Sequence, residues 1–306
     1  MSSKLTPPKS SPVEHTTAQT STNEVRSGLT VSVTKALARN KSGLISAIFL
    51  AVVVIAAVFA PWLATYDPIA IDTSRRLSAI SAEHWLGTDA FGRDIYSRAI
   101  YGAKISLIVG LSVMTLSIFI GMIVGIVAGY FRNVGAVIMR VMDGIMAIPS
   151  ILLAIALVSL TGGSIVVVLI AITIPEVPRV VRLVRSVVLS VTNEPYVEAA
   201  HSLGTRLPRL LFKHMVPNTI APLIVQGSYI FSSAILIEST LSFLGAGLPP
   251  EIASWGNMMA EGRIYFQLLP GLTLYPGILL AMTLLSVNIL GDVLRDTLDP
   301  KMEKSR

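Results

Sequence analysis

Charged residues are scarce in this 306-residue chain: they make up 14% of the sequence, where a soluble domain carries about 25%. Hydrophobic residues make up 53%, and the mean hydropathy is +0.71. A chain with so few polar side chains cannot cover a soluble surface of its size, so the composition predicts a membrane protein. Cysteine is absent, which excludes disulfides and thiolate metal or redox sites but leaves the compartment open.

Apolar periodicity is almost missing from the first part of the chain. Residues 1–43 are rich in Ser, Thr and Pro. Such a segment cannot bury enough apolar surface to offset its chain entropy. We therefore predict a disordered cytoplasmic tail over residues 1–43 and a transmembrane domain over residues 44–306. The first apolar run begins only at Leu44, too far along for a signal peptide, and we expect it to stay attached as a span.

Long apolar runs, in contrast, are abundant. A helix that crosses a bilayer needs about 20 apolar residues, and the sequence offers six candidates. Prolines interrupt the third and fourth, which is compatible with a membrane helix when neighbouring helices or water satisfy the freed carbonyl groups. The predicted spans are Leu44–Ala64, Ile105–Tyr130, Val134–Leu160, Ser164 to about Val184, Thr219–Leu244 and Gly271–Leu290.

Positive charge is distributed unevenly between the segments that join these spans. Six spans place both termini on one side, and that side, which includes residues 176–218, holds eighteen Lys and Arg residues against six on the other. Cytoplasmic loops carry an excess of Lys and Arg, so we predict that both termini and the segment between spans four and five are cytoplasmic. The net charge of +6 fits membrane lipid as a partner, and we expect no nucleic acid.

Catalytic and metal-binding motifs are absent as well. The sequence contains neither H-E-x-x-H nor G-x-S-x-G, and its four histidines are scattered, so we expect no catalytic residue and no metal site. Residues 87–94, GTDAFGRD, come close to the phosphate-binding pattern G-x-x-x-x-G-K-[ST]. Arg93 and Asp94 replace the Lys and the hydroxyl of that motif, so we interpret this stretch as a structured extracytoplasmic turn.

One short polar segment stands between two apolar ones. In EPYVEAAHSLG, residues 194–204, Pro195 suits the start of a helix and Gly204 the position just past its end. These signals predict a helix of about nine residues, followed by a second short helix from Thr205 to Pro217. A helix this short is marginal in water unless something holds it. Its expected apolar surface consists of Tyr196, Val197, Ala199, Ala200 and Leu203.

The same segment carries a spacing pattern. Glu198-Ala199-Ala200, followed by Gly204, His214 and Pro217 at their intervals, resembles the EAA signature of bacterial ABC-importer permeases. The resemblance implies a coupling loop over about residues 192–217, whose helix docks on a cytoplasmic ATP-hydrolysing subunit. His214 stands where many members have an aliphatic residue, a departure common in the peptide-importer branch. The alternative is an amphipathic helix that lies on the lipid headgroups.

Three further stretches resemble one branch of that family. Residues 84–110, 238–263 and 288–301 are similar to signatures of the second permease subunit of dipeptide, oligopeptide and nickel importers. The resemblance implies an all-α, type I ABC-importer permease fold in a bacterial inner membrane. It implies half of a pore, paired with a sibling permease as a heterodimer.

The resemblance also implies partners that do the chemistry. Two cytoplasmic ATPase subunits would hold ATP and Mg²⁺, and an extracytoplasmic substrate-binding protein would deliver the cargo. The chain itself is then no enzyme and binds no cofactor. Its cargo stays open among peptides, nickel complexes, glutathione-like compounds and other small solutes.

Ionisable residues in the predicted spans are candidates for the translocation path. Glu238, near the outer third of span five, is expected to shape the outer gate or, alternatively, to fix helix packing. Arg179 and Arg182, at the inner end of span four, either line the path or anchor the helix at the lipid headgroups. Asp143 is expected to pair with a nearby base.

Small residues recur every four positions in span two. Gly121, Gly125 and Gly129 form a stripe on one helix face. Such stripes let two helices approach closely in a membrane, so we predict a packing role here and no substrate contact.

Two other functional classes stay open from the sequence. A secondary transporter would use no ATPase and is expected to show inverted repeats with paired broken helices, and we find no convincing internal repeat. An intramembrane hydrolase would need a nucleophile–base pair or a metal motif, and neither occurs. Copurification with a nucleotide-binding subunit separates the importer from the first class, and labelling by a covalent inhibitor would reveal the second.

Overall fold

Helices dominate the fold. The computed structural model describes residues 40–298, and within that range long helices are joined by a loop over residues 64–94 and by shorter turns. Four helical stretches are long and apolar enough to cross a membrane: α2 (Lys41–Val58), α4 (Ile95–Tyr130), the continuous stretch Leu207–Phe243 and α12 (Gly271–Leu298). The pair α5 (Arg132–Met146) and α6 (Ser150–Thr161) passes the same test when taken together, which gives five.

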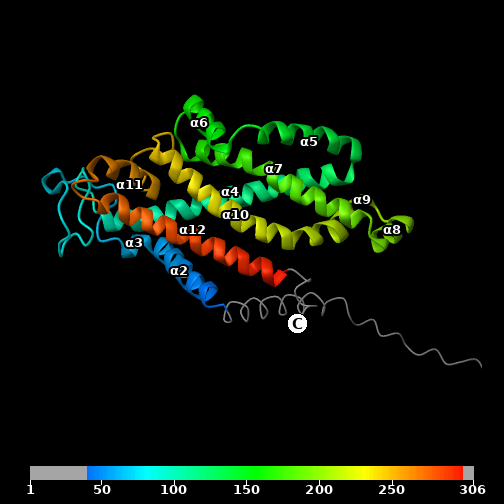
Figure 1. The fold of residues 1–306 in the computed structure, drawn as a ribbon, viewed down its shortest axis with the longest axis horizontal. Helices are drawn as coiled ribbons and strands as arrows, with labels where there is room; N and C mark the ends of the chain where they lie inside the picture. Colours follow the sequence, from blue (N-terminus) through cyan, green and yellow to red (C-terminus); the bar gives the residue numbers. More distant parts are fainter. Residues whose placement is uncertain (1–39, 299–306) are drawn as a thin grey trace, which may run out of the picture.

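The remaining predicted span, the fourth, corresponds to α7 (Ile165–Thr192). This helix contains Glu176 and three arginines, so apolar composition alone does not mark it as a span. It is nevertheless 28 residues long, and it packs against α4 and α10 (Val216–Phe243) in the middle of the bundle (Figure 1). The predicted total of six therefore depends on α7, since composition supports four or five.

The third predicted span is not one helix. The sequence-based range Val134–Leu160 is divided between α5 and α6, whose axes differ by 82°. Pro149 lacks the N–H that would continue α5, and it disfavours helical backbone at Ile148. Pro175 and Pro178 lie inside α7 without ending it. The difference lies in the packing, because α7 is buried along most of its length whereas α5 buries only Gly135.

Other predicted boundaries shift by a few residues. α4 begins at Ile95 rather than Ile105, because the carboxylate of Asp94 caps it by accepting a hydrogen bond from the Ser97 N–H at 2.8 Å. The first span ends at Val58 and continues after a break as the short α3 (Ala60–Leu63). α12 extends to Leu298 rather than Leu290. The predicted tail, residues 1–43, lies almost entirely outside the described residues, and α2 already begins at Lys41.

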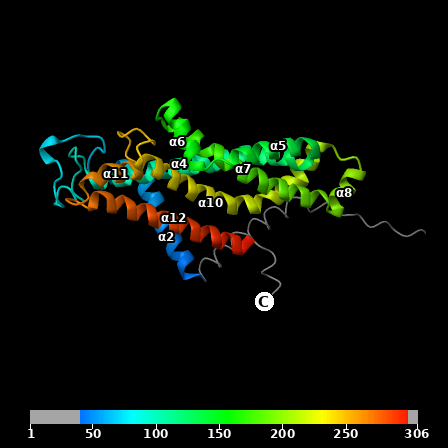
Figure 2. The ribbon, with the colours of Figure 1, turned by 45° about the horizontal axis from the view of Figure 1, so that its top comes forward.

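Short helices occupy both ends of the bundle (Figures 1 and 2). At one end, which we call the α8 end, α8 (Pro195–Ser202) is followed by α9 (Leu207–Leu210) and by a π-helix, Leu211–Met215, that runs into α10. At the other, the α11 end, loop 64–94 lies beside α11 (Trp255–Gly262). α12 runs from the α11 end toward the α8 end. Two short 3₁₀ turns, Thr73–Arg75 and Arg263–Tyr265, also belong to the α11 end.

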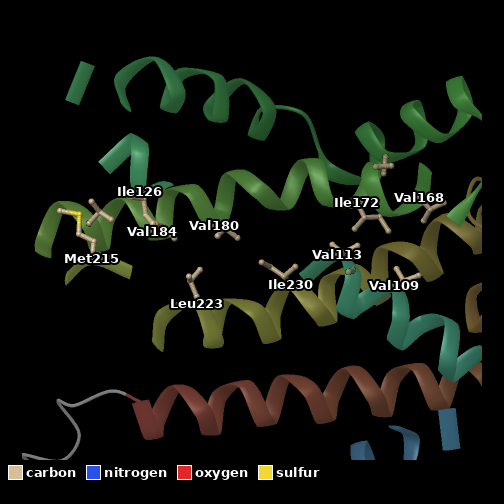
Figure 3. Packing of buried hydrophobic residues seen from close by; sticks show 14 of the residues in the cluster. Val109, Val113, Ile126, Val168, Ile172, Val180, Val184, Met215, Leu223 and Ile230 are labelled. Atoms are coloured by element: carbon tan, nitrogen blue, oxygen red, sulfur yellow. The ribbon is translucent and has the colours of Figure 1, made fainter. Parts of the chain in front are cut away.

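The glycine stripe of α4 packs directly against α7, as predicted. A Cβ added to Gly125 would lie 2.7 Å from the Cβ of Val184, and one added to Gly129 would lie 2.7 Å from that of Val188. Such contacts are impossible, so the two helices approach this closely only through glycine. Val180 and Val184 belong to the main apolar core, which lies between α4, α7 and α10 (Figure 3). This packing fixes α7 closely against α4.

Candidate functional site

The predicted short helix at the α8 end is present. α8 covers Pro195–Ser202, with Pro195 in its first turn. Gly204 has φ +74°, and its N–H bonds to the His201 carbonyl while the Thr205 N–H bonds to the Ala200 carbonyl. These two bonds and the positive φ make the helix-terminating arrangement that favours glycine. A Cβ added to Gly204 would meet no atom of residues 40–298 within 4 Å, so backbone conformation, rather than space, requires glycine here.

The apolar surface predicted for this helix is only partly correct. Val197 is 2% exposed and packs in the main core with Leu210 and Met215. Figure 3 shows Met215 at one end of the row of core side chains that reaches Val168 at the other. Ala200 is half-buried, whereas Tyr196, Ala199 and Leu203 are exposed. Val197, packed in the core with Leu210 and Met215, therefore anchors α8.

A small polar contact joins α8 to the start of α10. The rings of Tyr196 and His214 lie 5.9 Å apart. Asn218 donates one hydrogen bond to the Tyr196 hydroxyl at 3.3 Å and another to the His214 carbonyl at 2.6 Å. Sequence reasoning included Tyr196 and His214 but missed Asn218, which follows Pro217 in the first turn of α10.

The second short helix predicted from Thr205 to Pro217 is not separate. α9, the π-helix and α10 form one continuous helical stretch, Leu207–Phe243, of 37 residues. His214 lies in the π-helical turn and Pro217 in the first turn of α10. π-helical turns occur frequently at functional sites. The α8 end is thus joined to the bundle by a continuous helix.

The outer face of the loop is rich in exposed side chains. Leu203 is 87% exposed and Phe212 is 74% exposed, and Glu198 and Ala199 beside them are exposed as well. Exposed large apolar side chains mark surfaces that contact another protein or a membrane.

The three candidate path residues lie in two different places. Arg179 and Arg182 project from α7, with side chains that are each 46% exposed. Arg182 pairs with Asp143 of α5 at 2.6 Å, which confirms the pairing expected for Asp143. Glu238 is fully buried in α10, far along the helix toward the α11 end. The structure therefore does not bring Glu238 together with the arginines.

Glu238 lies in a tight contact between α10 and α11. Its carboxylate accepts hydrogen bonds from the hydroxyls of Ser242 at 2.9 Å and Ser239 at 3.3 Å. A Cβ added to Gly256 of α11 would lie 2.7 Å from the Cα of Ser239, so the two helices nearly touch. This geometry is that of the packing alternative; the gate role predicted for Glu238 stays a prediction.

Sequence reasoning missed an ionic cluster at the α11 end, which consists of Asp89, Arg93, Arg98 and Glu261. Arg93 pairs with Asp89 at 2.6 Å and with Glu261 of α11, and Arg98, which is 1% exposed, lies between the same two carboxylates. Burial raises the pKa of Glu261 above its ordinary value, although the two arginines act in the opposite direction.

The phosphate-loop-like stretch is a structured turn. Gly87 and Gly92 have φ values of +82° and +78°, and Thr88 and Asp94 form an isolated bridge. Arg93 pairs with the carboxylates of Asp89 and Glu261, and Asp94 caps α4. Sequence reasoning also missed the role of Glu176 of α7, which is fully buried and pairs with Arg179. The charged residues within the family-like stretch 84–110 were the only signal in the sequence for this cluster. The sequence did not indicate which residues they pair with.

No group of three or more metal-ligating His, Asp or Glu side chains occurs within residues 40–298.

Comparisons with known proteins agree on one family. Residues 95–304 match the family described as binding-protein-dependent transport system inner membrane component. Residues 29–79 match the N-terminal transmembrane domain of oligopeptide transport permease C, so this second match begins inside the predicted tail.

Relatives cover most of the chain. It is 52% identical over 240 residues to a probable peptide ABC transporter permease, y4tQ, of Sinorhizobium fredii, which covers 78% of this chain and 82% of that protein. It is 42% identical over 270 residues to the dipeptide transport system permease DppC of Alkalihalophilus pseudofirmus, with 88% and 89% covered. It is 36% identical over 266 residues to the oligopeptide transport system permease OppC of Bacillus subtilis, with 87% of each covered.

A solved structure shares the fold. The chain superimposes on a chain of the inward-facing MetNI methionine ABC transporter with a TM-score of 0.54, at 16% identity, over 66% of this chain and 97% of that one. At that identity the likeness shows a common fold only. Together with the family matches, it identifies this chain as a multi-pass inner-membrane protein that belongs to the binding-protein-dependent ABC-importer permeases, in their peptide branch.

Proposed function

We propose that this chain forms half of the pore through which an ATP-driven importer moves peptides or similar small solutes. The names of its relatives, which are dipeptide, oligopeptide and other peptide permeases, support that cargo class. A sibling permease completes the pore as a heterodimer. Two cytoplasmic ATPase subunits, which hold ATP and Mg²⁺, dock from one side, and a substrate-binding protein delivers cargo from the other.

The observation that carries the proposal is the geometry of the coupling loop, residues 192–217. Its outer face exposes Leu203 and Phe212, whereas its inner face is fixed by Val197 and by the Tyr196–Asn218 contact. A docked subunit can therefore pull on α8 and move the continuous helix Leu207–Phe243. The alternative is an amphipathic helix whose large apolar side chains lie in the lipid headgroups, and the copurification experiment below separates it from docking.

The orientation follows from charge. Lys and Arg are in excess in the tails and in residues 176–218. We infer that the α8 end and both termini are cytoplasmic, since positive charge is retained on that side. The α11 end then faces the substrate-binding protein.

The mechanism needs no bond making or breaking by this chain. ATP binding closes the two ATPase subunits, α8 moves with them, and the bundle changes between inward-facing and outward-facing states. A partner can shift such an equilibrium only by the difference in its affinity for the two states. The role of this chain is to supply two packed arrangements that the docked ATPases stabilise to different extents.

The docking part is tested with Leu203→Asp in the assembled importer. Because Leu203 is 87% exposed, the permease should fold normally, while the buried charge in the interface should prevent copurification of the ATPase subunits. Ile264→Asp, at a residue 76% exposed at the α11 end, is the matched control and should keep the ATPases bound. Normal copurification and uptake with Leu203→Asp would contradict the proposal.

The orientation is tested with Leu203→Cys. The native sequence has no cysteine, so this variant carries a single thiol. A membrane-impermeant maleimide should label it in inside-out vesicles stripped of the ATPase subunits, because Leu203 is then uncovered, and leave it unlabelled in intact cells. Labelling in intact cells would place the coupling loop outside.

A further inference from the structure

The face of α7 that points away from α4 carries charge near the midpoint of a 28-residue helix. Arg179 and Arg182 are one turn apart on this face, and each side chain is about half exposed. The core shared by α4, α7 and α10 is built mainly from apolar side chains, with buried hydroxyls at Ser117 and Ser232. Arg179 directly precedes Val180, a fully buried member of that core, so the charges lie at the level of the apolar core.

Glu176 fixes the position of Arg179. Its carboxylate is fully buried and accepts two hydrogen bonds from one guanidinium nitrogen of Arg179, at 2.9 and 3.0 Å. The hydroxyl of Ser233 on α10 donates to the same carboxylate at 3.0 Å. A buried carboxylate needs such partners, because an unpaired charge in an apolar interior is costly. Among residues 40–298, Glu176 alone accepts from Arg179, so the other guanidinium N–H groups point outward.

A second pair lies one turn further toward the α8 end. Arg182 donates to Asp143 of α5 at 2.6 Å, and both side chains are about half exposed. α5 continues this polar surface, because Arg132, Ala136 and Arg140 share its exposed face with Asp143. Residues at intervals of three and four lie on one side of a helix. Two helices thus present a joined polar wall, made by Glu176, Arg179, Arg182 and Asp143, that balances two positive against two negative charges.

Ionisable side chains within a membrane face the interior of a bundle or a water-filled cavity. In the isolated chain the side chains of Arg179, Arg182 and Asp143 are about half exposed, and lipid cannot cover them without burying charge. We propose that the wall lines the water-filled path between this chain and its sibling. Arg179 and Asp143 are the groups that meet the carboxylate and ammonium ends of a peptide, and Glu176 is a positioning residue that acts through Arg179. This inference rests on the proposed pore function and assigns that pore a surface on this chain.

The water-filled path is tested by cysteine accessibility, without removing any charge. Ala136→Cys on α5 and Ser186→Cys on α7 place single thiols on the exposed side of the wall. In the assembled importer, a charged methanethiosulfonate should modify both at least about tenfold faster than Ile123→Cys, because only the thiolate reacts and it forms in water. Ile123 is the control, since it is exposed on α4 among apolar neighbours. Equally slow reaction at all three positions would overturn the proposal.

The positioning role of Glu176 is tested by a double-mutant comparison. Glu176→Gln and Arg179→Gln should each raise the KM for peptide uptake by about tenfold, and the double variant should be no worse than either alone, because the two residues act as one unit. Arg179→Lys should restore part of the loss. Independent, multiplying effects would overturn the role, as would a fall in maximal rate with an unchanged KM.

The outcomes separate this inference from the proposed function. ATPase copurification is measured in every variant, since none of these residues lies in the coupling loop. If the ATPases stay bound and the wall is inaccessible, only the path assignment fails. If Leu203→Asp leaves the ATPases bound, the coupling proposal fails while the accessibility result still stands on its own.

Discussion

The two ends of the bundle are built in opposite ways. At the α11 end, loop 64–94 is tied to α11 by the Asp89–Arg93–Arg98–Glu261 cluster, and Trp255 is buried and donates to the Ala99 carbonyl at 3.0 Å. At the α8 end, by contrast, Val197 is the buried side chain of a short helix whose other residues are mostly exposed. One end is held by a buried network of ion pairs, whereas the short helix at the other end is held mainly by one buried valine.

The comparison shows which contacts stabilise each end of the bundle. A short helix is marginal on its own and persists because a few contacts hold it. Segments with few buried contacts open locally at low free energy, and moving elements are drawn from that class. We therefore expect changes at the α11 end to destabilise the whole subunit, and changes at the α8 end to act on coupling while the subunit stays folded.

The largest effect is expected from Arg98→Ala. It leaves the carboxylates of Asp89 and Glu261 with one arginine instead of two in a largely buried site, which should cost about 3 kcal/mol. The melting temperature of the purified subunit should fall by about 6 °C or more. Arg75→Ala, in loop 64–94 at the same end, is the matched control, because its pair with Glu83 is exposed and is worth at most about 1 kcal/mol. Equal melting shifts for both variants would mean that the cluster is not what holds this end.

A smaller and local effect is expected from Val197→Ala. The lost burial should cost about 1–2 kcal/mol, confined to α8. Trypsin should then cleave after Arg206 and Arg209 about tenfold faster, while the melting temperature stays the same. Val166→Ala, at an exposed position of α7, should change neither quantity. A large melting shift for Val197→Ala would show that the α8 end is part of the global folding unit after all.

The smallest effect is expected from Gly204→Ala. An alanine at φ +74° costs about 1–2 kcal/mol, because its Cβ disfavours left-handed backbone. The α8 termination should loosen, and peptide-stimulated ATPase activity should drop relative to basal activity. Gly204→Asn is the sensitive control, since asparagine tolerates this conformation better. If alanine and asparagine behave alike, the turn conformation is not what matters for coupling.

Much of the fold could be predicted because it depends on local composition. Apolar runs located the helices that cross the membrane, and Pro195 and Gly204 located α8 to within two residues. The Gly121, Gly125 and Gly129 stripe predicted a tight helix contact, although not its partner, the Val180, Val184 and Val188 face of α7. The spacing of residues within one helix can be read from the sequence, but the surface of the neighbouring helix that packs against it cannot.

The charged sites could be predicted only in part. Asp143 was expected to find a base, yet its partner Arg182 is on another helix, and Arg93 and Glu261 are separated by 168 residues. The sequence offers no signal for the partners of Glu176, whereas burial between α7 and α10 places it beside Arg179 and Ser233. Pairings of this kind depend on which helices become neighbours.

The sequence by itself determined that this is a polytopic membrane protein with a short capped helix between two apolar runs, because hydropathy, capping signals and small-residue spacing act within a single helix or turn. Only the tertiary structure decided that Pro149 ends α5 while Pro175 and Pro178 remain inside α7. The physical reason is that a proline removes the same hydrogen bond in both helices, and only close packing against α4 and α10 holds α7 together across the loss.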